Sequence, residues 1–395
     1  MEKSILIIGA GIAGLNASKS AREADKECDI TMLEMGSMNT YTRTRIPHYI
    51  SGETSFEELT PYGDDWYEKN RINLIKQTRV TGIDIDNKSV LTDKGSYQYD
   101  KLIIAIGSSP FKPPIKGIDL KNVVTIRTIH DADNVIRLSK NTRSCTIIGG
   151  GLLGLEIANS IKQLGCEVNV VERNDRLLPR QADNIASSLL LDALKSKGMN
   201  VYLNGETEEL CGDDAVKCVK LKDGRVIDTD FVILSMGVKA NLEPFQNTGL
   251  DIGRAIKVDE YMRTNIEGIY AAGDAAEYKG NNYCIWPIAI AQGKVAGSNA
   301  AGKPVVYEDI KPHTQLKIHG ITLFTIGNIF SEDCDVFQRF DEGSGKYIKF
   351  FLKDGIIEGA IVFGEPSLPN KVRKAVESKK KFIDISNIDQ LLESL

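Results

Sequence analysis

The stretch Ile5-Leu6-Ile7-Ile8-Gly9-Ala10-Gly11-Ile12-Ala13-Gly14 decides the fold of this 395-residue chain. Its four apolar residues predict a buried strand, and the spacing Gly9-x-Gly11-x-x-Gly14 predicts a tight turn into a helix. In a βαβ unit that binds a dinucleotide, the first glycine makes the turn. The second admits the pyrophosphate, and the third packs the helix on the strand. Ile12 and Ala13 would then present main-chain N–H groups to the phosphates at the helix N-terminus.

A second predicted strand, residues 29–34, ends in the acid Glu34 about twenty residues beyond the last glycine, where such units hold a ribose 2′-OH. A glycine triplet alone also fits an ordinary strand-to-helix turn. The strand, the helix and the terminal acid together favour the nucleotide site.

The same pattern returns in the middle of the chain. Residues 144–154 predict a strand, a glycine turn and a helix, and residues 167–172 predict a strand that ends in Glu172. The candidate nucleotide-binding residues of this turn are Gly149, Gly151, Leu152, Leu153 and Gly154. Two such units indicate two separate dinucleotide sites. Glu172 would accept a bond from a free ribose 2′-OH and repel a 2′-phosphate, which favours NADH, although Arg173 beside it acts against this preference.

Three further apolar segments end in glycine or in glycine and an acid. They are residues 101–107, with Ala105 and Gly107 at the end, residues 231–237, ending in Gly237, and residues 268–274, ending in Asp274. Open parallel sheets bind ligands at the carboxyl ends of their strands, so these ends are candidate cofactor-binding positions.

The remaining expected elements complete two units and a smaller third one. Helices are expected over residues 56–70, 131–139, 184–197 and 288–301, and a linker rich in proline at 110–117. From Val305 onward the composition predicts a small α+β domain. It has strands in hairpins over 313–329 and 347–363 and a basic helix over 370–381, whose run Lys379-Lys380-Lys381 is expected on a solvated face.

Composition excludes several classes of function. The apolar share of 42%, the charged share of 26% and the net charge of −5 describe an ordinary soluble protein of two or three domains that is no general nucleic-acid binder. No apolar run approaches the ~20 residues that span a bilayer, and the N-terminal run lacks the features of a signal peptide. Seven scattered cysteines without C-x-x-C spacing fit a reducing cytoplasm and predict no metal site.

This order of motifs resembles the pyridine nucleotide–disulfide oxidoreductases, flavoproteins with two dinucleotide-binding domains. The resemblance implies an α/β fold with two Rossmann-like domains, as in glutathione reductase, and a small α+β C-terminal domain. It implies FAD on the first unit and NADH on the second, with Asp274 bonded to the ribityl and pyrophosphate part of FAD. The implied domains are residues 1–113 with 240–304 for FAD, 114–239 for NADH, and 305–395.

Four shorter motifs narrow the resemblance. Residues 41–45, 66–68, 178–181 and 316–320 are similar to NADH:rubredoxin oxidoreductases and to the N-terminal module of the large subunit of NADH nitrite reductase. This likeness implies that Arg43, Val80 and Glu156 lie near FAD and that Lys317 lies at the pyrimidine edge of the flavin, where positive charge stabilises the reduced anion. Arg45, Glu156 and Lys317 are the candidate catalytic residues. Pro47-His48 departs from the polar continuation expected there.

One absence directs the expected chemistry. Disulfide reductases carry C-x-x-x-x-C after the first acid and the related peroxidases carry one cysteine there, whereas residues 37–46 contain none. The C-terminal segment also lacks the His-Pro…Glu pair of disulfide reductases. Electrons would therefore leave the flavin directly, to a small acidic one-electron carrier such as rubredoxin. An NADH oxidase that uses O₂ and a flavin-bound redox-sensing or interaction protein are the alternatives. Nitrite reduction is not expected within this chain. The protein is expected to be a monomer or a weak dimer.

Overall fold

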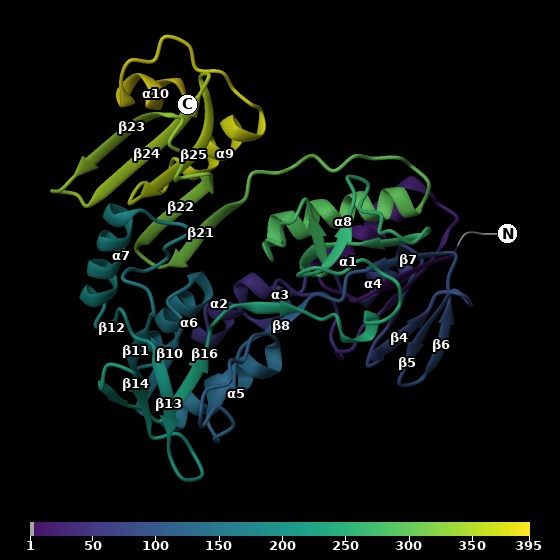
Figure 1. Cartoon of the computed structure of the whole chain (residues 1–395), viewed down its shortest axis with the longest axis horizontal. Helices are drawn as coiled ribbons and strands as arrows, with labels where there is room; N and C mark the ends of the chain where they lie inside the picture. The colour runs from purple at the N-terminus through teal and green to yellow at the C-terminus, as the bar shows by residue number, and fades with distance from the viewer. Residues whose placement is uncertain (1–3) are drawn as a thin grey trace. The chain divides into compact units, whose positions relative to one another are not determined.

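The computed structural model describes residues 4–395 and groups the chain into two compact units. The first unit joins the chain up to Arg45 with Thr54–Ser109 and Val238–Asp309, so it is discontinuous in sequence. The second joins Ile46–Glu53, Pro110–Gly237 and Ile310–Leu395. Figure 1 shows the chain coloured by residue number. The division of the second unit into an NADH domain and a C-terminal domain stays a prediction.

A five-stranded parallel sheet forms the centre of the first unit. Its order is β19 (Ile269–Ala271), β7 (Lys101–Ile104), β1 (Ser4–Ile8), β2 (Asp29–Leu33) and β3 (Ile72–Ile75). Successive side chains of β1 pack on opposite faces, with Ile5 and Ile7 in one apolar cluster and Leu6 and Ile8 in the other. Burial on both faces explains why these strands are continuous apolar runs. The parallel pairing brings the predicted ligand positions to one edge.

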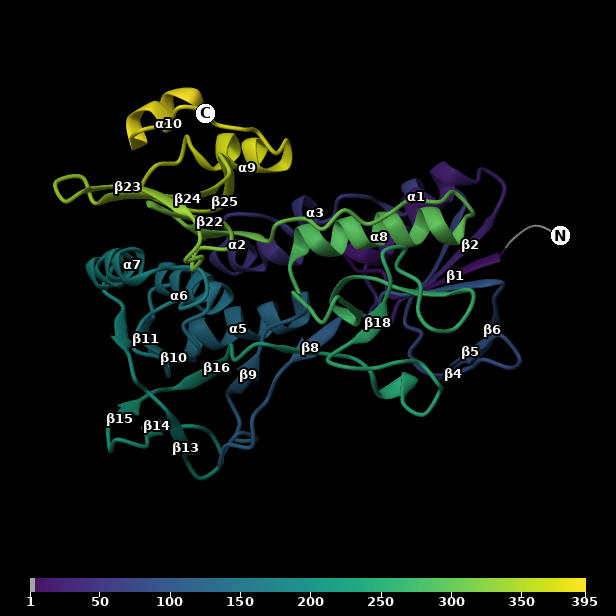
Figure 2. The same ribbon diagram turned by 45° about the horizontal axis from the view of Figure 1, so that its top comes forward.

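Two helices pack closely on one face of this sheet. Helices α1 (Ile12–Ala24) and α8 (Trp286–Ala300) lie side by side in both views (Figure 1 and Figure 2). A Cβ atom on Gly293 would lie 2.3 Å from the Ala13 carbonyl oxygen, and one on Gly297 would lie 2.0 Å from that of Ala17. Glycine at these positions lets the backbones approach, and this contact fixes α1 behind the first glycine turn.

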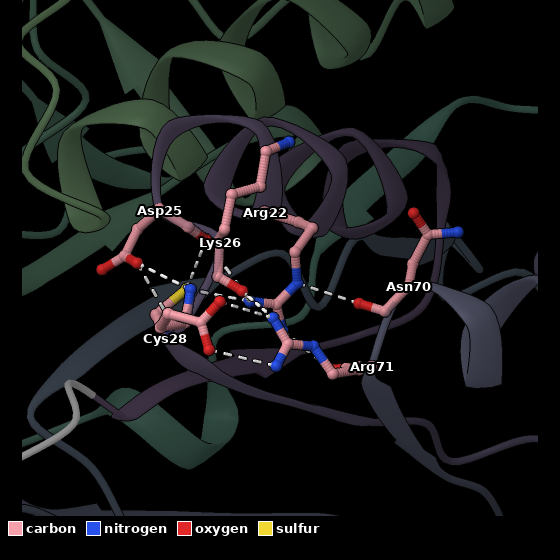
Figure 3. Close-up of polar contacts among 7 residues, drawn as sticks. Arg22, Asp25, Lys26, Cys28, Asn70 and Arg71 are labelled. Carbon is pink, nitrogen blue, oxygen red and sulfur yellow. Dashed lines mark hydrogen bonds and ion pairs between the residues drawn. The ribbon is translucent and has the colours of Figure 1, made fainter.

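The far end of α1 is fixed by a buried arginine (Figure 3). Arg22 is 7% exposed, and its guanidinium donates to the main-chain oxygens of Lys26 at 2.8 Å, Asn70 at 2.9 Å and Arg71 at 2.9 Å. These bonds satisfy a charge removed from water and tie the end of α1 to the turn before β3.

Shorter strands complete the first unit. An antiparallel sheet holds β4 (Val80–Asp84), β5 (Ser89–Thr92) and β6 (Gly95–Gln98), and β18 (Ile256–Val258) pairs with β20 (Ala276–Tyr278). The chain leaves and re-enters this unit at β8 (Ser108–Pro110) and β17 (Val238–Ala240).

The helix expected over residues 56–70 is wrong. The structure has α3 (Phe56–Leu59) and α4 (Asp64–Lys69), with a break between them. Pro61 lies in this break and cannot continue the main-chain hydrogen bonding, and Gly63 begins a new helix as its N-cap. A short 3₁₀ turn, η1 (Arg43–Arg45), and α2 (Ile46–Ser51) precede them and were not expected.

The second unit contains a parallel sheet that repeats the first. Its order is β12 (Asn200–Tyr202), β11 (Glu167–Val171), β10 (Ser144–Ile148), β16 (Phe231–Leu234) and β9 (Val123–Thr125). Its helices are α5 (Ile129–Asn141), α6 (Leu152–Gln163) and α7 (Asn184–Ser196), close to the expected bounds. An antiparallel excursion holds β13 (Thr207–Cys211), β14 (Cys218–Leu221) and β15 (Val226–Asp228).

An antiparallel sheet with two helices forms the C-terminal part of this unit. The sheet order is β21 (His313–Ile318), β22 (Ile321–Gly327), β25 (Ile356–Phe363), β24 (Lys346–Lys353) and β23 (Asp335–Asp341). Helices α9 (Pro369–Glu377) and α10 (Ile388–Ser394) cover one of its faces (Figure 2). The expected helix over 370–381 is wrong beyond Glu377, because Lys379 takes a left-handed conformation (φ +50°) that ends it.

None of the helices within residues 4–395 is long and apolar enough to cross a membrane.

Candidate functional site

In the first glycine turn, Gly9 and Gly14 leave no room for a side chain, whereas Gly11 does. Gly9 has φ +97°, and a Cβ atom there would lie 2.4 Å from the Ala105 carbonyl oxygen. A Cβ atom on Gly14 would lie 2.0 Å from the Gly9 oxygen, whereas one on Gly11 would meet no atom within 4 Å. Gly11 is also the N-cap of α1 and makes no side-chain cap. The space and the N–H groups at Gly11 therefore fit a phosphate.

Glu34 braces this turn. One carboxylate oxygen accepts the Ala10 N–H at 2.8 Å and the other accepts the Gly36 N–H at 2.8 Å. Each carboxylate oxygen can accept a further bond. The predicted ribose contact stays a prediction, and the carboxylate has a structural role that the sequence did not indicate.

The carboxyl edge of the sheet brings together residues far apart in the chain. Asp274 lies in the short turn η3 (Gly273–Ala275) directly after β19, and it accepts a hydrogen bond of 2.6 Å from the Ser108 hydroxyl. Gly107, with φ +79°, lets the chain turn after β7 so that Ser108 reaches Asp274. The buried Gln292 accepts the Gly273 N–H at 2.9 Å. Sequence reasoning missed Ser108 and Gln292, and only the position of Ser108 beside Gly107 gave a signal.

Three predicted flavin-site residues have structural partners of their own. The guanidinium of Arg45 donates to the Thr54 hydroxyl at 3.0 Å and to the Glu58 main-chain oxygen at 3.2 Å. The guanidinium of Arg43 lies 5.6 Å from the centre of the Tyr41 ring. The side chain of Val80 is buried in the core, so a ligand contact there would use its main chain. Their assignments to the flavin stay predictions.

A hydroxyl group, not a thiol, contacts the first glycine turn. Thr40 is 3% exposed, donates to the Ala10 carbonyl oxygen at 2.6 Å and lies 3.0 Å from the Tyr67 hydroxyl. Cys145, Cys166, Cys211, Cys218 and Cys334 are free thiols. In the part of the chain that the structure describes, no group of three or more His, Cys, Asp or Glu side chains could hold a metal ion.

The second glycine turn makes the same kind of main-chain contacts as the first. A Cβ atom on Gly149 (φ +115°) would lie 2.1 Å from the Ser235 carbonyl oxygen, and one on Gly154 would lie 2.2 Å from that of Gly149. A Cβ atom on Gly151 would again meet nothing within 4 Å. The next residues, Leu152 and Leu153, begin α6, and Gly237 (φ +92°) follows β16 at the same edge.

Glu172 braces this second turn as Glu34 braces the first. It is 6% exposed, and one oxygen accepts the Gly150 N–H at 2.9 Å. The other oxygen accepts the Asn174 N–H at 2.9 Å and a further bond from the Asn174 side-chain amide. Asn174 was missed, although it lies only two residues beyond Glu172, where its side-chain amide can bond the acid.

Glu156 and Lys317 are brought together, but through the lysine main chain. Lys317 lies on the edge strand β21, and its N–H donates to a Glu156 oxygen at 2.8 Å, while its side chain is exposed. Glu156 is 8% exposed, and this burial raises its pKa to about 7 against the opposing hydrogen bond and charge of Lys317. A flavin contact for either residue stays a prediction.

Comparison with known proteins gives the family. Residues 3–293 match the model of the family described as pyridine nucleotide-disulphide oxidoreductase. The chain belongs to this family. Residues 312–380 match a second one, the rubredoxin NAD+ reductase C-terminal domain. The predicted family and fold are therefore confirmed, and so are the oxidoreductase class and the cofactors FAD and NADH.

Two relatives and one solved structure show how far the likeness extends. The chain is 36% identical to NADH-rubredoxin oxidoreductase of Clostridium acetobutylicum over 99% of both proteins. The crystal structure of the NADH:rubredoxin oxidoreductase from that organism matches with a TM-score of 0.81, 35% identity and complete coverage of both chains. The chain is also 36% identical to nitrite reductase [NAD(P)H] of Bacillus subtilis, of which it covers 49%, so it spans about half the length of that relative.

Proposed function

We propose that this protein oxidises NADH and passes the electrons through FAD to a small iron carrier of the rubredoxin type. The observation that carries the proposal is the match of residues 312–380 to the rubredoxin NAD+ reductase C-terminal domain, within a chain that aligns from end to end with an NADH-rubredoxin oxidoreductase. Both the domain match and the end-to-end alignment agree with a small electron carrier as the partner.

The residues present fit two dinucleotides. The open space at Gly11 and Gly151 would admit the two pyrophosphates, and the N-termini of α1 and α6 would face them with positive dipole ends. Glu34 and Glu172 bond main-chain N–H groups of the two turns and would also accept bonds from the riboses. Asp274, oriented by Ser108, would accept a bond from the ribityl part. When bound, FAD takes two electrons from NADH as a hydride and releases them singly.

We expect no thiol of this chain to receive electrons from the flavin, because residues 37–46, which follow the first glycine turn and its acid, contain no cysteine. Thr40 occupies the contact with Ala10 there, and a hydroxyl cannot form a disulfide. We therefore propose that the electrons leave the flavin without passing through a cysteine of this chain and go directly to the carrier.

The carrier would dock on the basic end of the C-terminal segment. Lys371 and Lys374 of α9 are exposed, and the exposed Lys379, Lys380 and Lys381 follow it. Two arginines are less available for docking, since Arg373 pairs with Glu377 and the Arg45 guanidinium is bonded to Thr54. Small iron carriers are commonly acidic, so this surface offers the opposite charge.

The test of the acceptor compares rates under the same NADH concentration. Anaerobic reduction of a purified rubredoxin should be fast and saturable, whereas oxygen consumption without a carrier should be slow. Fast oxygen consumption together with slow rubredoxin reduction would contradict the proposal and indicate an NADH oxidase.

The test of the docking surface uses charge reversal. The double variant Lys371→Glu/Lys374→Glu should lower kcat/KM for rubredoxin, and added salt should lower it in the unmodified enzyme, because only this encounter is steered over a long range. Flavin reduction by NADH should not change. Lys140→Glu, an exposed lysine at the end of α5, is the matched control. An equal loss in the control would contradict the assignment of the surface.

A further inference from the structure

The antiparallel sheet of β13, β14 and β15 in the second unit places two cysteines opposite one another. Cys211 ends β13 and Cys218 begins β14, and the two are register partners. Their neighbours Leu210 and Val219 are also partners, and both are buried in the apolar core. Since side chains alternate along a strand, the two cysteine side chains share the opposite, outer face, where each is partly exposed.

We propose that Cys211 and Cys218 form a site of reversible oxidation, a dithiol that peroxide converts to a disulfide. Residues directly opposite in an antiparallel pair have Cβ atoms about 4.5–5.5 Å apart, and a disulfide needs about 3.5–4.5 Å, so a small adjustment of the hairpin closes the bond. The remaining partly exposed thiols, Cys284 and Cys334, lie on other segments of the chain, and Cys28, Cys145 and Cys166 are buried.

The surrounding charges distinguish the two thiols. Burial, the contact with Cys211 and the charge of Asp228 raise the pKa of Cys218 to about 11, and Asp228 is its partner on β15. The charged groups near Cys211 are Lys116 and Lys220, which pair with Glu209 and Glu208. The raised pKa disfavours a thiolate at Cys218, so the first attack is assigned to Cys211.

The chemistry balances with one molecule of hydrogen peroxide. The Cys211 thiolate attacks one peroxide oxygen, the O–O bond breaks, and the leaving hydroxide takes a proton to become water. The sulfur of Cys218 then attacks the resulting sulfenic acid. The S–S bond forms, the S–O bond breaks, and the second water leaves with the Cys218 proton. Two thiols are oxidised by two electrons in total, and a dithiol reductant returns them with two protons.

Peptide mapping of the FAD-loaded protein tests this site. Lys217 lies between the cysteines, so trypsin separates them and a disulfide joins two peptides. After treatment with hydrogen peroxide and alkylation of the remaining thiols, the Cys211 and Cys218 peptides should be cross-linked with the loss of two hydrogen atoms, and dithiothreitol should release them. Absence of this cross-link, or its formation with Cys284 or Cys334 instead, would overturn the proposal.

Two single variants test the order of attack. In Cys218→Ser, a sulfenic acid should persist at Cys211 and react with dimedone. In Cys211→Ser, Cys218 should remain unlabelled. Labelling of Cys218 to the same extent would overturn the assignment of Cys211 as the first nucleophile. The readout is independent of NADH and of the carrier, so it stands apart from the proposed function.

Discussion

At the residue scale, two glutamates each bond main-chain N–H groups of a glycine turn and are each predicted to bond a ribose as well. Glu34 and Glu172 each end a strand, and each bonds a main-chain N–H of its glycine turn and another two residues beyond the acid itself. An acid at this position therefore shapes the turn, and its bond to a ribose is a separate prediction. A substitution must preserve the first role if it is to report on the second.

The variant Glu172→Gln removes the charge that would repel a 2′-phosphate. Its single side-chain oxygen can still accept one of the two main-chain N–H bonds of the turn, so the turn is partly preserved. The unmodified enzyme should prefer NADH over NADPH by about tenfold or more in kcat/KM, or about 1.4 kcal/mol, and Glu172→Gln should narrow this gap. Steady-state kinetics with both nucleotides measure it. Glu34→Gln, the equivalent change in the other unit, should leave the preference unchanged, and equal rates in the unmodified enzyme would refute the assignment.

Glu156 predicts a dependence of stability on pH. Its folded pKa of about 7 lies above the ordinary value of 4.5, because burial disfavours the charge. Between these values the folded protein binds more protons than the unfolded chain, so stability falls as pH rises through the window. The loss attributable to this carboxyl approaches about 3 kcal/mol above the window.

Urea unfolding of Glu156→Gln at several pH values checks this expectation. The amide still accepts the Lys317 N–H but does not titrate, so the variant should match the unmodified protein in acid and become the more stable of the two as pH rises. Parallel pH profiles for the two proteins would show that Glu156 is not the titrating group.

At the scale of elements, the two glycine turns offer a reciprocal experiment. A side chain at Gly11 or Gly151 meets no protein atom within 4 Å and both glycines have ordinary extended conformations, so valine at either position should fold. Gly11→Val should give mostly apoprotein, because the side chain would occupy the space for the FAD pyrophosphate. Gly151→Val should keep its flavin and lose affinity for NADH. Flavin absorbance and the KM for NADH distinguish the two variants. A fully flavinated Gly11→Val protein would show that FAD does not bind at the first unit.

The same elements show what a sequence can predict. Both turns, their strands and their terminal acids were predicted correctly, because each depends on local geometry that glycine or a buried apolar run supplies. The contacts of Ser108 and Gln292 could not be predicted, since each joins segments that only the fold brings together. The strand β23 was missed because nearly all its residues are exposed, so it has no apolar pattern.

At the scale of the whole molecule, two repeated nucleotide-binding sheets and a C-terminal sheet with a basic helix agree with the alignment along the entire chain. The family is named for disulfide chemistry, but residues 37–46 of this chain contain no cysteine, and the Thr40 hydroxyl contacts the first glycine turn. We therefore expect the flavin to be the only group that stores electrons on the way from NADH to the carrier.

An anaerobic titration of the FAD-loaded protein with NADH tests this claim most directly. The flavin absorbance should disappear with one NADH per FAD, and no long-wavelength band of a thiolate–flavin charge-transfer complex should form, because no cysteine lies within residues 37–46. The Cys211–Cys218 pair should be reduced with dithiothreitol beforehand, so that it takes up no electrons. Consumption of two NADH per FAD by such a pre-reduced sample, with a charge-transfer band, would contradict the account.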